Sequence, residues 1–422
     1  MQLPKNKIVL FTDCFIFGGS ENLLINLSNY DELRKSFDIK ILYPNNKWYR
    51  EIIEQIIGNA AELLPLNLLS YESIIYYISN KYNGFIVKIA AILLFVPKKI
   101  LFQIWNFVII YLALKRIKPD ILHINNGGYP GARSCRTAVL CGKINRTKRI
   151  VFTINNLAKK RKGLFESLID VYINTHVDKF VTASLSAKQR LIINRLFTQA
   201  KIDTIPNTIF NDECLVFSKN QLRNEFNLSQ EMLIIGSAGL LTKRKGYNVL
   251  INSIYKIKLK FPQLDFKVFI FGEGEDKCKL TELINQFELQ DNIILAGYRK
   301  EILGYMSDFD IFVLPSIDDE DLPYVNLEAM LLGKPLIGTK VAGIVQQIDQ
   351  NINGILINPN NSEELSEALI ALMGDKEKRI KMGENSSLKY WEQFNYKMTM
   401  NKYYQLYQSL VKEDDLRSNS NE

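Results

Sequence analysis

The sequence predicts an α/β protein with two parallel sheets, each covered by helices on both faces. Short apolar runs that predict strands alternate with longer helical patterns over most of the 422 residues. Strands buried between helices are typical of parallel sheets. A chain of this length suits two domains, and its 47% of hydrophobic residues can fill two cores.

The predicted strands fall into two series. The first comprises residues 8–12, 38–43, 121–124, 150–153, 179–183 and 204–206, and the second 233–238, 265–271, 293–296, 311–314, 335–338 and 354–357. Between them, Ile205-Pro206-Asn207-Thr208 combines a strand end with turn residues. We therefore expect a first domain over 1–207, a linker over 208–230 and a second domain over 231–388. The aromatic-rich run 388–411 predicts one long helix, and 413–422 a frayed polar tail.

Composition narrows the function. The formal charge of 53 − 45 = +8 suits phosphate-bearing ligands or an anionic membrane surface and does not by itself indicate nucleic acid. Five cysteines without a CxxC pair predict free thiols in a reducing compartment, and with only two histidines no zinc site is expected. The N-terminus lacks the charged and apolar regions of a signal peptide, which predicts a cytoplasmic protein.

Residues 85–114 are nearly all apolar but are interrupted by Lys88 and by Pro97-Lys98-Lys99. A membrane-spanning helix needs roughly 20 apolar residues without such a break. Two interpretations stay open. The segment is either a pair of helices that lie at a membrane surface, with the flanking basic residues near lipid headgroups, or a pair of core helices.

Three glycine-containing turns follow predicted strands. Gly18-Gly19-Ser20-Glu21 follows the first strand, Lys243-Arg244-Lys245-Gly246 follows strand 233–238, and Gly272-Glu273-Gly274 follows strand 265–271. Glycines let backbone N–H groups approach a phosphate, and basic side chains at the carboxyl edge of a parallel sheet suit a diphosphate. Taken singly, each is also explained by a tight turn or a solvated basic loop.

The most specific motif follows strand 311–314. Glu320 lies in the loop after this strand, and Glu328 lies in the next helix. Ligands of open α/β sheets bind outside the carboxyl ends of the strands, where each carboxylate can hold a pair of sugar hydroxyls. Glu328 lies in the apolar stretch 325–332, and a carboxylate buried there needs a partner. A ribose would supply one, and the alternative is a buried structural carboxylate.

Together these motifs resemble family 4 of the retaining glycosyltransferases. The EX7E motif of that family is similar to the stretch from Glu320 to Glu328, and its KG and G-x-G motifs are similar to Lys245-Gly246 and Gly272-Glu273-Gly274. Its IPNG segment is similar to Ile205-Pro206-Asn207-Thr208. The resemblance is strong over about residues 233–375 and weaker over 8–28, 120–210 and the last helix.

The resemblance implies the GT-B fold, with two Rossmann-like doubly wound domains that face a cleft. A C-terminal helix, at about 389–412, would cross back to complete the first domain. The catalytic group would be Lys245 and Arg244 at the donor diphosphate and Glu320 at the donor sugar, while Glu328 would bind the ribose. The other implied donor contacts are Gly18, Gly19, Gly239, Gly272, Gly274, Tyr298, Arg299, Leu322, Pro323, Tyr324 and Val325. The implied acceptor-side residues are His123, Asn125, Asn126 and Asn155.

This sequence departs from the family pattern at two places. Leu240 stands where the family usually has an arginine, so Arg244 or Lys243 would supply the positive charge. Asn125 and Asn155 stand where histidines are common. An asparagine can bind a sugar hydroxyl but cannot carry a proton at neutral pH.

The resemblance implies front-face displacement, in which the leaving diphosphate helps to deprotonate the acceptor hydroxyl and neither a metal nor a cofactor is needed. The donor would be a UDP- or GDP-linked sugar, and no residue decides between them. The acceptor would be a saccharide. Segment 85–114 and the charge favour a lipid-linked one at the inner face of the cytoplasmic membrane, in O-antigen, capsule or exopolysaccharide assembly.

Two other functions compete with sugar transfer. An NAD-type oxidoreductase is disfavoured because no GxGxxG follows the first strand. A non-catalytic sugar-binding or scaffold protein with the same fold is supported only by the departures at Leu240, Asn125 and Asn155.

Overall fold

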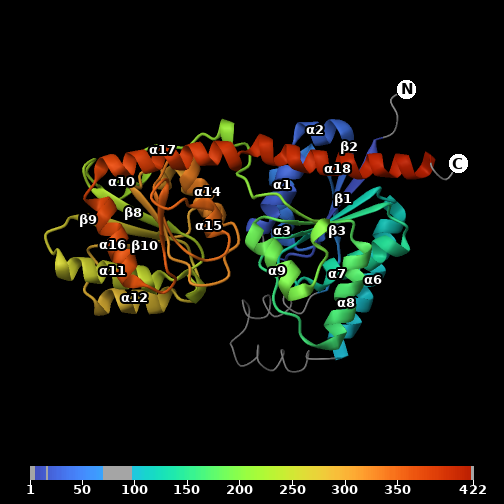
Figure 1. Ribbon diagram of the computed structural model, residues 1–422, viewed down its shortest axis with the longest axis horizontal. Coiled ribbons are helices and arrows are strands. Elements are labelled where there is room, and N and C mark those ends of the chain that lie inside the picture. Colours follow the sequence, from blue (N-terminus) through green and yellow to red (C-terminus); the bar gives the residue numbers. More distant parts are fainter. Residues whose placement is uncertain (1–4, 16–17, 70–96, 420–422) are drawn as a thin grey trace. The chain divides into compact units, whose positions relative to one another are not determined.

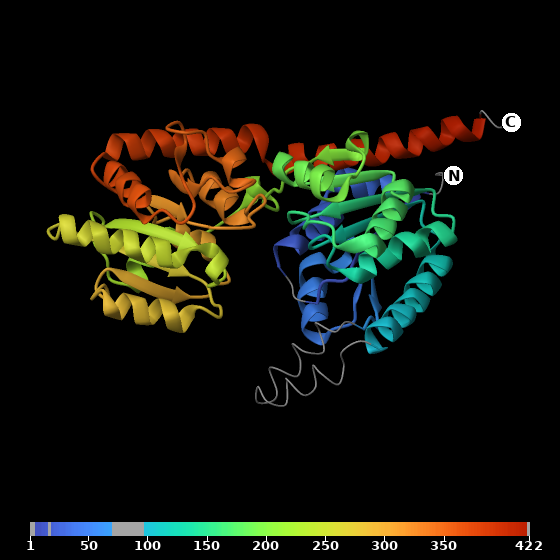
Figure 2. The same cartoon turned by 60° about the horizontal axis from the view of Figure 1, so that its bottom comes forward.

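The computed structural model describes residues 5–15, 18–69 and 97–419 (Figure 1). These residues form two compact units. The first unit runs to Ile205 and takes up the chain again at Met400, and the second runs from Pro206 to Thr399. Each unit is one parallel sheet with helices on both faces (Figure 1 and Figure 2), so the predicted fold class is confirmed.

The first unit holds a seven-stranded sheet of order β3-β2-β1-β4-β5-β6-β7. The two central strands β4 and β5 are buried along their whole length, as expected for strands between two helical layers. The strands are β1 Asn6–Thr12, β2 Phe37–Pro44, β3 Glu62–Leu66, β4 Ile121–Asn126, β5 Arg149–Ile154, β6 Lys179–Thr182 and β7 Ile202–Thr204. The helices are α1 Asn22–Asn29, α2 Asp31–Ser36, α3 Lys47–Ile57, α6 Pro97–Ile117, α7 Arg133–Ile144, α8 Gly163–His176 and α9 Leu185–Arg195.

The second unit holds a six-stranded sheet of order β10-β9-β8-β11-β12-β13. The strands are β8 Leu233–Ala238, β9 Phe266–Phe271, β10 Ile293–Gly297, β11 Ile311–Leu314, β12 Leu336–Thr339 and β13 Gly354–Ile357. The helices are α10 Gln221–Glu225, α11 Tyr247–Lys260, α12 Lys277–Gln286, α13 Ile302–Met306, α14 Tyr324–Leu331, α15 Ile344–Gln347, α16 Ser362–Met373 and α17 Lys376–Gln393.

The strand order places a switch point in each sheet. In the second unit the chain winds from β8 outward to β9 and β10, and then returns to add β11 on the other side of β8. The loops after β8 and β11 therefore leave the same edge toward opposite faces, and such an edge is where open α/β sheets bind ligands. In the first unit the loops after β1 and β4 have the same relation.

Each predicted strand has a counterpart, and three of them have the predicted bounds. The prediction of a strand at 204–206 was misplaced, because β7 ends at Thr204 and Pro206 has no N–H to donate to a ladder. Strand β3 was not predicted. It is a partly exposed edge strand that contains Pro65, so it lacks the continuous apolar run of a central strand.

The predicted single helix over 388–411 is wrong, because the structure has two helices there. α17 ends at Gln393, and α18 (Tyr396–Asn419) follows after a short break. Asn395 caps the new helix by accepting from Met398 N (2.9 Å), and Asp212 accepts from Tyr396 N (2.7 Å). The backbone of α18 also continues to Asn419 through the predicted polar tail, which contains no proline or glycine.

The apolar segment predicted at 85–114 is described from residue 97 onward, and residues 85–96 lie outside the described part of the chain. α6 begins at Pro97, where the missing N–H costs no helical hydrogen bond. One side of α6 is core, since Asn106, Ile110 and Leu114 are fully buried. Within the ranges that the structure describes, no helix is long and apolar enough to cross a membrane.

Candidate active site

The loops after β8 and β11 are tied together at the carboxyl edge of the second sheet. Ile317 N donates to Arg244 O (2.8 Å). Gly246, which links the turn after β8 to α11, has a φ of +70°, and a Cβ there would lie 2.1 Å from Pro315 O. Only glycine allows the two loops to pack this closely.

Glu320 is bonded to two basic side chains of the neighbouring loop. Lys245 Nζ lies 2.6 Å from Glu320 Oε1. Arg244 Nη1 donates to the same oxygen and also to Asp319 O (2.8 Å). Lys245 and Glu320 are only 7% and 5% exposed. Two cations and one carboxylate leave this group with one positive charge in excess, which suits an anionic ligand.

The charge of Lys245 depends on negative neighbours. Burial lowers the pKa of Lys245, and the charge of Glu320 opposes this effect. Lys245 therefore lies in a place where a further anion would stabilise its charged form.

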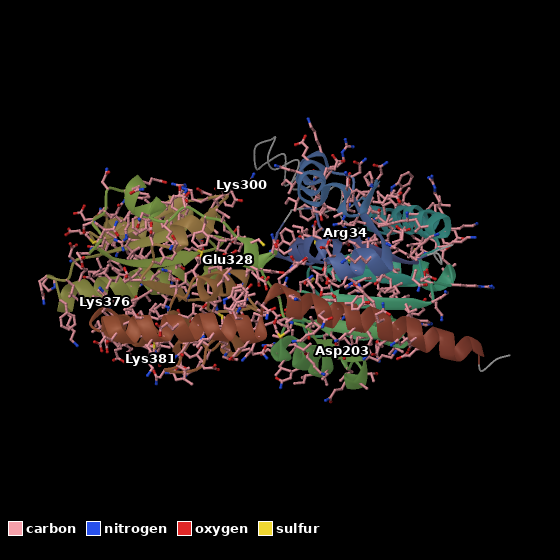
Figure 3. All side chains as sticks on the ribbon, turned by 90° about the horizontal axis from the view of Figure 1, so that it is seen from above. Arg34, Asp203, Lys300, Glu328, Lys376 and Lys381 are labelled. Atoms are coloured by element: carbon pink, nitrogen blue, oxygen red, sulfur yellow. The ribbon has the colours of Figure 1, made fainter. Side chains whose placement is uncertain are left out.

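Glu328 lies on α14, in the segment that follows Glu320. Its Oε2 atom is buried and has no hydrogen-bond partner among the residues described, and the same holds for Ser316 Oγ. Burial raises the pKa of Glu328 to about 7. Figure 3 shows Glu328 away from Lys376 and Lys381, which lie on α17. A buried carboxylate oxygen without a donor is costly unless a ligand supplies one.

The backbone between Glu320 and α14 is packed against the loop after β12. Gly343 N donates to Glu320 O (3.2 Å). A Cβ at Gly343 would lie 1.6 Å from Asp321 O, so this glycine allows the loop that carries Glu320 to pack directly against the loop after β12. Gly343 was not predicted as a site residue.

Leu322 and Pro323 are held by side-chain amides on their carbonyl groups. Asn207 Nδ2 donates to Leu322 O (2.8 Å), and Gln347 Nε2 donates to Pro323 O (3.1 Å). α14 then begins with Tyr324 and Val325, both partly exposed. The first N–H groups of a helix lack intrahelical partners and carry its positive dipole end, which favours a negative group at this point.

The predicted glycines at the ends of β8 and β9 allow close backbone contact. Gly239 and Gly272 have φ values of +151° and +138°, and a Cβ at Gly272 would lie 1.9 Å from Gly239 O. A Cβ at Gly274 would lie 2.3 Å from Leu241 O. Gly272 N also donates to Gly297 O (2.9 Å), which brings the end of β10 to the same edge.

Tyr298 and Arg299 follow β10 and differ in their contacts. Tyr298 is exposed. Arg299 is fixed, because its Nη2 donates to Glu225 Oε1 (2.6 Å) and its guanidinium lies over the ring of Tyr305. Tyr305 Oη donates to Glu225 Oε2 (2.7 Å), and the bonds from Tyr305 and Arg299 lower the pKa of Glu225. No local pattern marks Glu225 in the sequence.

In the first unit, the glycine turn after β1 is organised by a buried carboxylate. Glu21 Oε2 accepts from Gly18 N (3.2 Å) and from Ser20 Oγ (2.6 Å), while Thr12 Oγ1 donates to Oε1 (3.4 Å). Gly19 opens the helical turn that contains Glu21. Burial raises the pKa of Glu21. The N–H of Gly18 thus already has an acceptor inside the turn, and this role of Glu21 was not predicted from the sequence.

The predicted acceptor-side asparagines form one network at the carboxyl edge of the first sheet. Asn125 Nδ2 donates to Ser20 O (2.9 Å), and Asn125 Oδ1 accepts from Asn155 Nδ2 (2.7 Å). Asn155 Nδ2 also lies 3.0 Å from Asn126 O, and Asn126 Oδ1 accepts from Gly128 N (2.6 Å). These bonds fasten the glycine turn to the ends of β4 and β5.

His123 lies inside the first unit. It is 1% exposed, with Nδ1 at 2.5 Å from Tyr407 Oη and Nε2 at 2.7 Å from Thr153 Oγ1. Burial lowers its pKa to about 3, so the ring is neutral at physiological pH. Tyr407 belongs to α18, and His123 therefore ties this helix to β4 and β5.

The structure thus brings the predicted donor residues of the second unit to one sheet edge, and it places Gly18, Gly19 and the asparagines at the corresponding edge of the first unit. Within residues 5–15, 18–69 and 97–419, no three His, Cys, Asp or Glu side chains gather as metal ligands.

Two family models match the chain over these sites. A model described as Glycosyl transferases group 1 matches residues 218–389, which include Lys245, Glu320 and Glu328. A model described as Glycosyltransferase Family 4 matches residues 70–212, which include the asparagine network. The chain belongs to glycosyltransferase family 4.

Two relatives of this family 4 chain are named for different biosynthetic activities. The N-acetyl-alpha-D-glucosaminyl L-malate synthase of Bacillus anthracis is 25% identical over 234 residues, which cover 54% of this chain and only 60% of the synthase. The O-antigen biosynthesis glycosyltransferase WclY of Escherichia coli is 27% identical over 311 residues, which cover 71% of this chain and 81% of WclY.

A solved structure of Anabaena Alr3699/HepE in complex with UDP superposes on the family 4 chain with a TM-score of 0.76. The superposition covers 96% of this chain and 100% of that one at 16% identity. At this identity the likeness concerns the fold, which is that of the GT-B glycosyltransferases.

Proposed function

We propose that this protein is a retaining glycosyltransferase that moves a sugar from a UDP- or GDP-linked donor to a saccharide acceptor. The observation that carries the proposal is the convergence of Lys245, Arg244, Glu320 and the unpartnered Glu328 at one sheet edge. Family membership and the UDP named with the HepE structure support a nucleotide-sugar donor.

The excess positive charge beside Glu320 is suited to a sugar transfer that uses no protein nucleophile, because such a reaction depends on stabilising the leaving group. The bond from the anomeric carbon to the diphosphate breaks, the acceptor oxygen bonds to that carbon on the same face, and the acceptor proton passes to the departing diphosphate. Negative charge grows on that diphosphate, and Lys245 with Arg244 would stabilise it. These two cations would take the electrostatic part of a metal ion, so we propose that transfer is metal-independent and needs no cofactor.

Glu328 would bind the ribose of the nucleotide. Two ribose hydroxyls can donate to a carboxylate, and the free Oε2 of Glu328 has the acceptor capacity that this requires. Glu320 would hold the donor sugar through its hydroxyls while it keeps Lys245 and Arg244 in place.

The acceptor would be a lipid-linked saccharide in surface polysaccharide biosynthesis, reached at the inner face of the cytoplasmic membrane. The name of WclY supports the pathway class, and the apolar helix α6 supports a lipid neighbourhood. The protein would work in the cytoplasm as a peripheral membrane enzyme and would not bind nucleic acid.

A transfer assay tests the donor site. We expect the purified protein to transfer or hydrolyse a UDP- or GDP-linked sugar, and we expect Lys245→Ala and Glu320→Ala to lower the rate by at least about a hundredfold, since loss of one stabilising group costs about 2.7–4 kcal/mol. Of the two candidates for the missing arginine, Arg244 is the one that contacts Glu320, whereas Lys243 is exposed. Lys243→Ala is therefore the matched control from the same turn.

Near-wild-type rates in both site variants would remove Lys245 and Glu320 from the active site. A wild-type protein that binds nucleotide but neither transfers nor hydrolyses any donor would instead favour the non-catalytic sugar-binding function.

A further inference from the structure

Helices α6, α7 and α8 form one layer on the first sheet. α6 packs on α7, and α7 contacts α8 (Figure 1). α7 and α8 connect consecutive parallel strands, β4 to β5 and β5 to β6, and right-handed crossovers place such helices on the same face of a sheet. We call the outward side of this layer the α6–α8 face.

α8 turns an apolar stripe outward. Leu164, Phe165, Leu168 and Val171 are 86%, 77%, 69% and 60% exposed. Their spacing places them on one side of the helix. Large apolar side chains scattered singly are normal on a protein surface, but a contiguous stripe marks an interaction site.

The charged side of α8 is turned inward. The fully buried Arg195 bonds to Asp170 Oδ1 (2.9 Å) and to Glu166 Oε2 (3.0 Å), and Arg161 Nε lies 3.1 Å from Asp170 Oδ2. Both acids of α8 are used in these pairs. Breaking a buried ion pair leaves an unpaired charge, which is strongly unfavourable, so α8 is held with its apolar stripe toward solvent.

The neighbouring helices extend the apolar surface. On α6, Leu101, Ile104 and Leu112 are each more than half exposed on the side opposite the core. On α7, between the two, Leu140 and Ile144 are exposed. The α6–α8 face therefore carries large apolar side chains on all three helices.

The same stretch of chain is the most basic part of the protein. Residues 97–177 contain 15 Lys and Arg and 3 Asp and Glu, a formal charge of 15 − 3 = +12, against +8 for the whole chain. All three acids are paired, Asp120 with Lys148 and the other two with Arg195. Four exposed cations at the start of α7 and just before α8 make no ion pair within the described ranges: Arg133, Lys159, Lys160 and Lys162.

We propose that the α6–α8 face docks on an anionic lipid bilayer, with the apolar stripes in the headgroup–acyl boundary and the basic residues at the headgroups. A membrane surface accepts apolar and basic side chains together. The cores of protein interfaces are depleted in lysine, and a nucleic acid would engage the cations but leave the apolar stripe in water. Membrane docking rests on the proposed function only for its biological role, which would be to bring the enzyme to a lipid-linked acceptor at the membrane surface.

Flotation with phosphatidylglycerol and phosphatidylcholine vesicles tests the surface in the full-length protein. We expect binding to phosphatidylglycerol vesicles and at least about tenfold weaker binding for Phe165→Gln/Leu168→Gln, because two buried apolar side chains are lost. Lys159→Gln/Lys160→Gln should lose a similar factor, since each basic residue near such a surface contributes about fivefold. The matched controls are Leu259→Gln/Leu388→Gln, at apolar positions that are also more than half exposed, and Lys376→Gln/Lys381→Gln on α17 (Figure 3).

The proposed docking surface is contradicted if wild-type protein does not bind phosphatidylglycerol vesicles. It is also contradicted if the apolar double variant binds as wild type while salt alone abolishes binding. The latter result would identify a purely electrostatic surface of the kind that binds nucleic acid. UDP affinity and donor hydrolysis, measured on the same variants, should stay at the wild-type level. Vesicle binding without any sugar transfer would contradict the proposed enzymatic function but support the docking surface. Sugar transfer without vesicle binding would contradict the docking surface but support the enzymatic function.

Discussion

Glu328 is a residue whose ionisation should respond to a bound ligand. Its pKa is raised to about 7 by burial, and its Oε2 atom has no donor within the part of the chain described. Ribose hydroxyls donate to the ionised form, so nucleotide binding should lower this pKa. The ionised fraction rises as pH rises through 7, and affinity should rise with it.

We therefore expect UDP affinity to increase between pH 6 and 8 by up to about tenfold. Calorimetry at pH 6.5 in buffers of different ionisation enthalpy should detect proton release on binding. Glu328→Gln should bind more weakly, with less pH dependence and less proton release. If Glu328→Gln released as many protons on UDP binding as wild type, Glu328 would not contact the nucleotide.

His123 shows how a predicted site residue can belong to the core. Its pKa is lowered to about 3 by burial, whereas an unfolded histidine titrates near 6.5. Between about pH 3 and pH 6.5 the folded state therefore binds fewer protons than the unfolded state. The stability that His123 contributes is present above pH 6.5 and is lost as pH falls toward 3.

Denaturant unfolding between pH 7 and 4 measures this effect. The free energy of unfolding should fall more steeply in wild type than in His123→Gln, by up to about 1.4 kcal/mol per pH unit. Parallel curves for the two proteins would contradict the buried, neutral state of His123.

At the scale of elements, the turn Lys243–Lys245 with Gly246 sets the position of the basic group. Gly246 has a positive φ and touches Pro315 O, whereas Gly58 has a φ of +52° and open space where a Cβ would lie, with nothing within 4 Å. Alanine at Gly58 should cost about 1–2 kcal/mol for the left-handed backbone alone. Alanine at Gly246 carries the same strain and a backbone clash.

We expect Gly246→Ala to lower the melting temperature more than Gly58→Ala and to weaken UDP binding as well, because the clash displaces Lys245. Thermal unfolding and UDP titration of both variants measure this. Equal losses of stability, with UDP affinity unchanged in both, would show that the contact with Pro315 does not position the loop.

The elements also show where sequence patterns stop being informative. The strands of both sheets were predictable because a buried apolar run between turn residues is a local signal. The break between α17 and α18 was not, because it depends on Asp212, which is far away in the sequence. The outward stripe of α8 was missed for the same reason, since only the partners from Arg161 and Arg195 reveal which side of α8 faces inward.

The candidate site divides in the same way. The strand pattern predicted that Lys245 and Glu320 would lie just after strands and Glu328 in the following helix, whereas the roles of these residues were implied by the family resemblance. Glu225 was not, because its contact with Arg299 joins segments distant in the sequence. The use of both the amide nitrogen and the amide oxygen of Asn125 could not be foreseen either, because a sequence does not show which neighbours an amide contacts.

At the scale of the whole molecule, the formal charge is unevenly distributed along the chain. The stretch 97–177 in the first unit holds more than the net charge of the chain, and the remainder carries 8 − 12 = −4. The basic group beside Glu320 is therefore a local feature of the second unit that does not follow from the overall charge. This is why a single lysine there can be tested without altering the general attraction of the protein for anions.

The most direct test of the donor site is a calorimetric titration of wild type, Lys245→Met and Lys243→Met with UDP and with GDP. We predict that wild type binds one of the two nucleotides, that Lys243→Met binds it equally well, and that Lys245→Met binds it about tenfold to a hundredfold more weakly, since a hydrogen bond to a charged group contributes about 1.5–3 kcal/mol. Failure of wild type to bind either nucleotide, or equal affinity in Lys245→Met, would contradict the donor site.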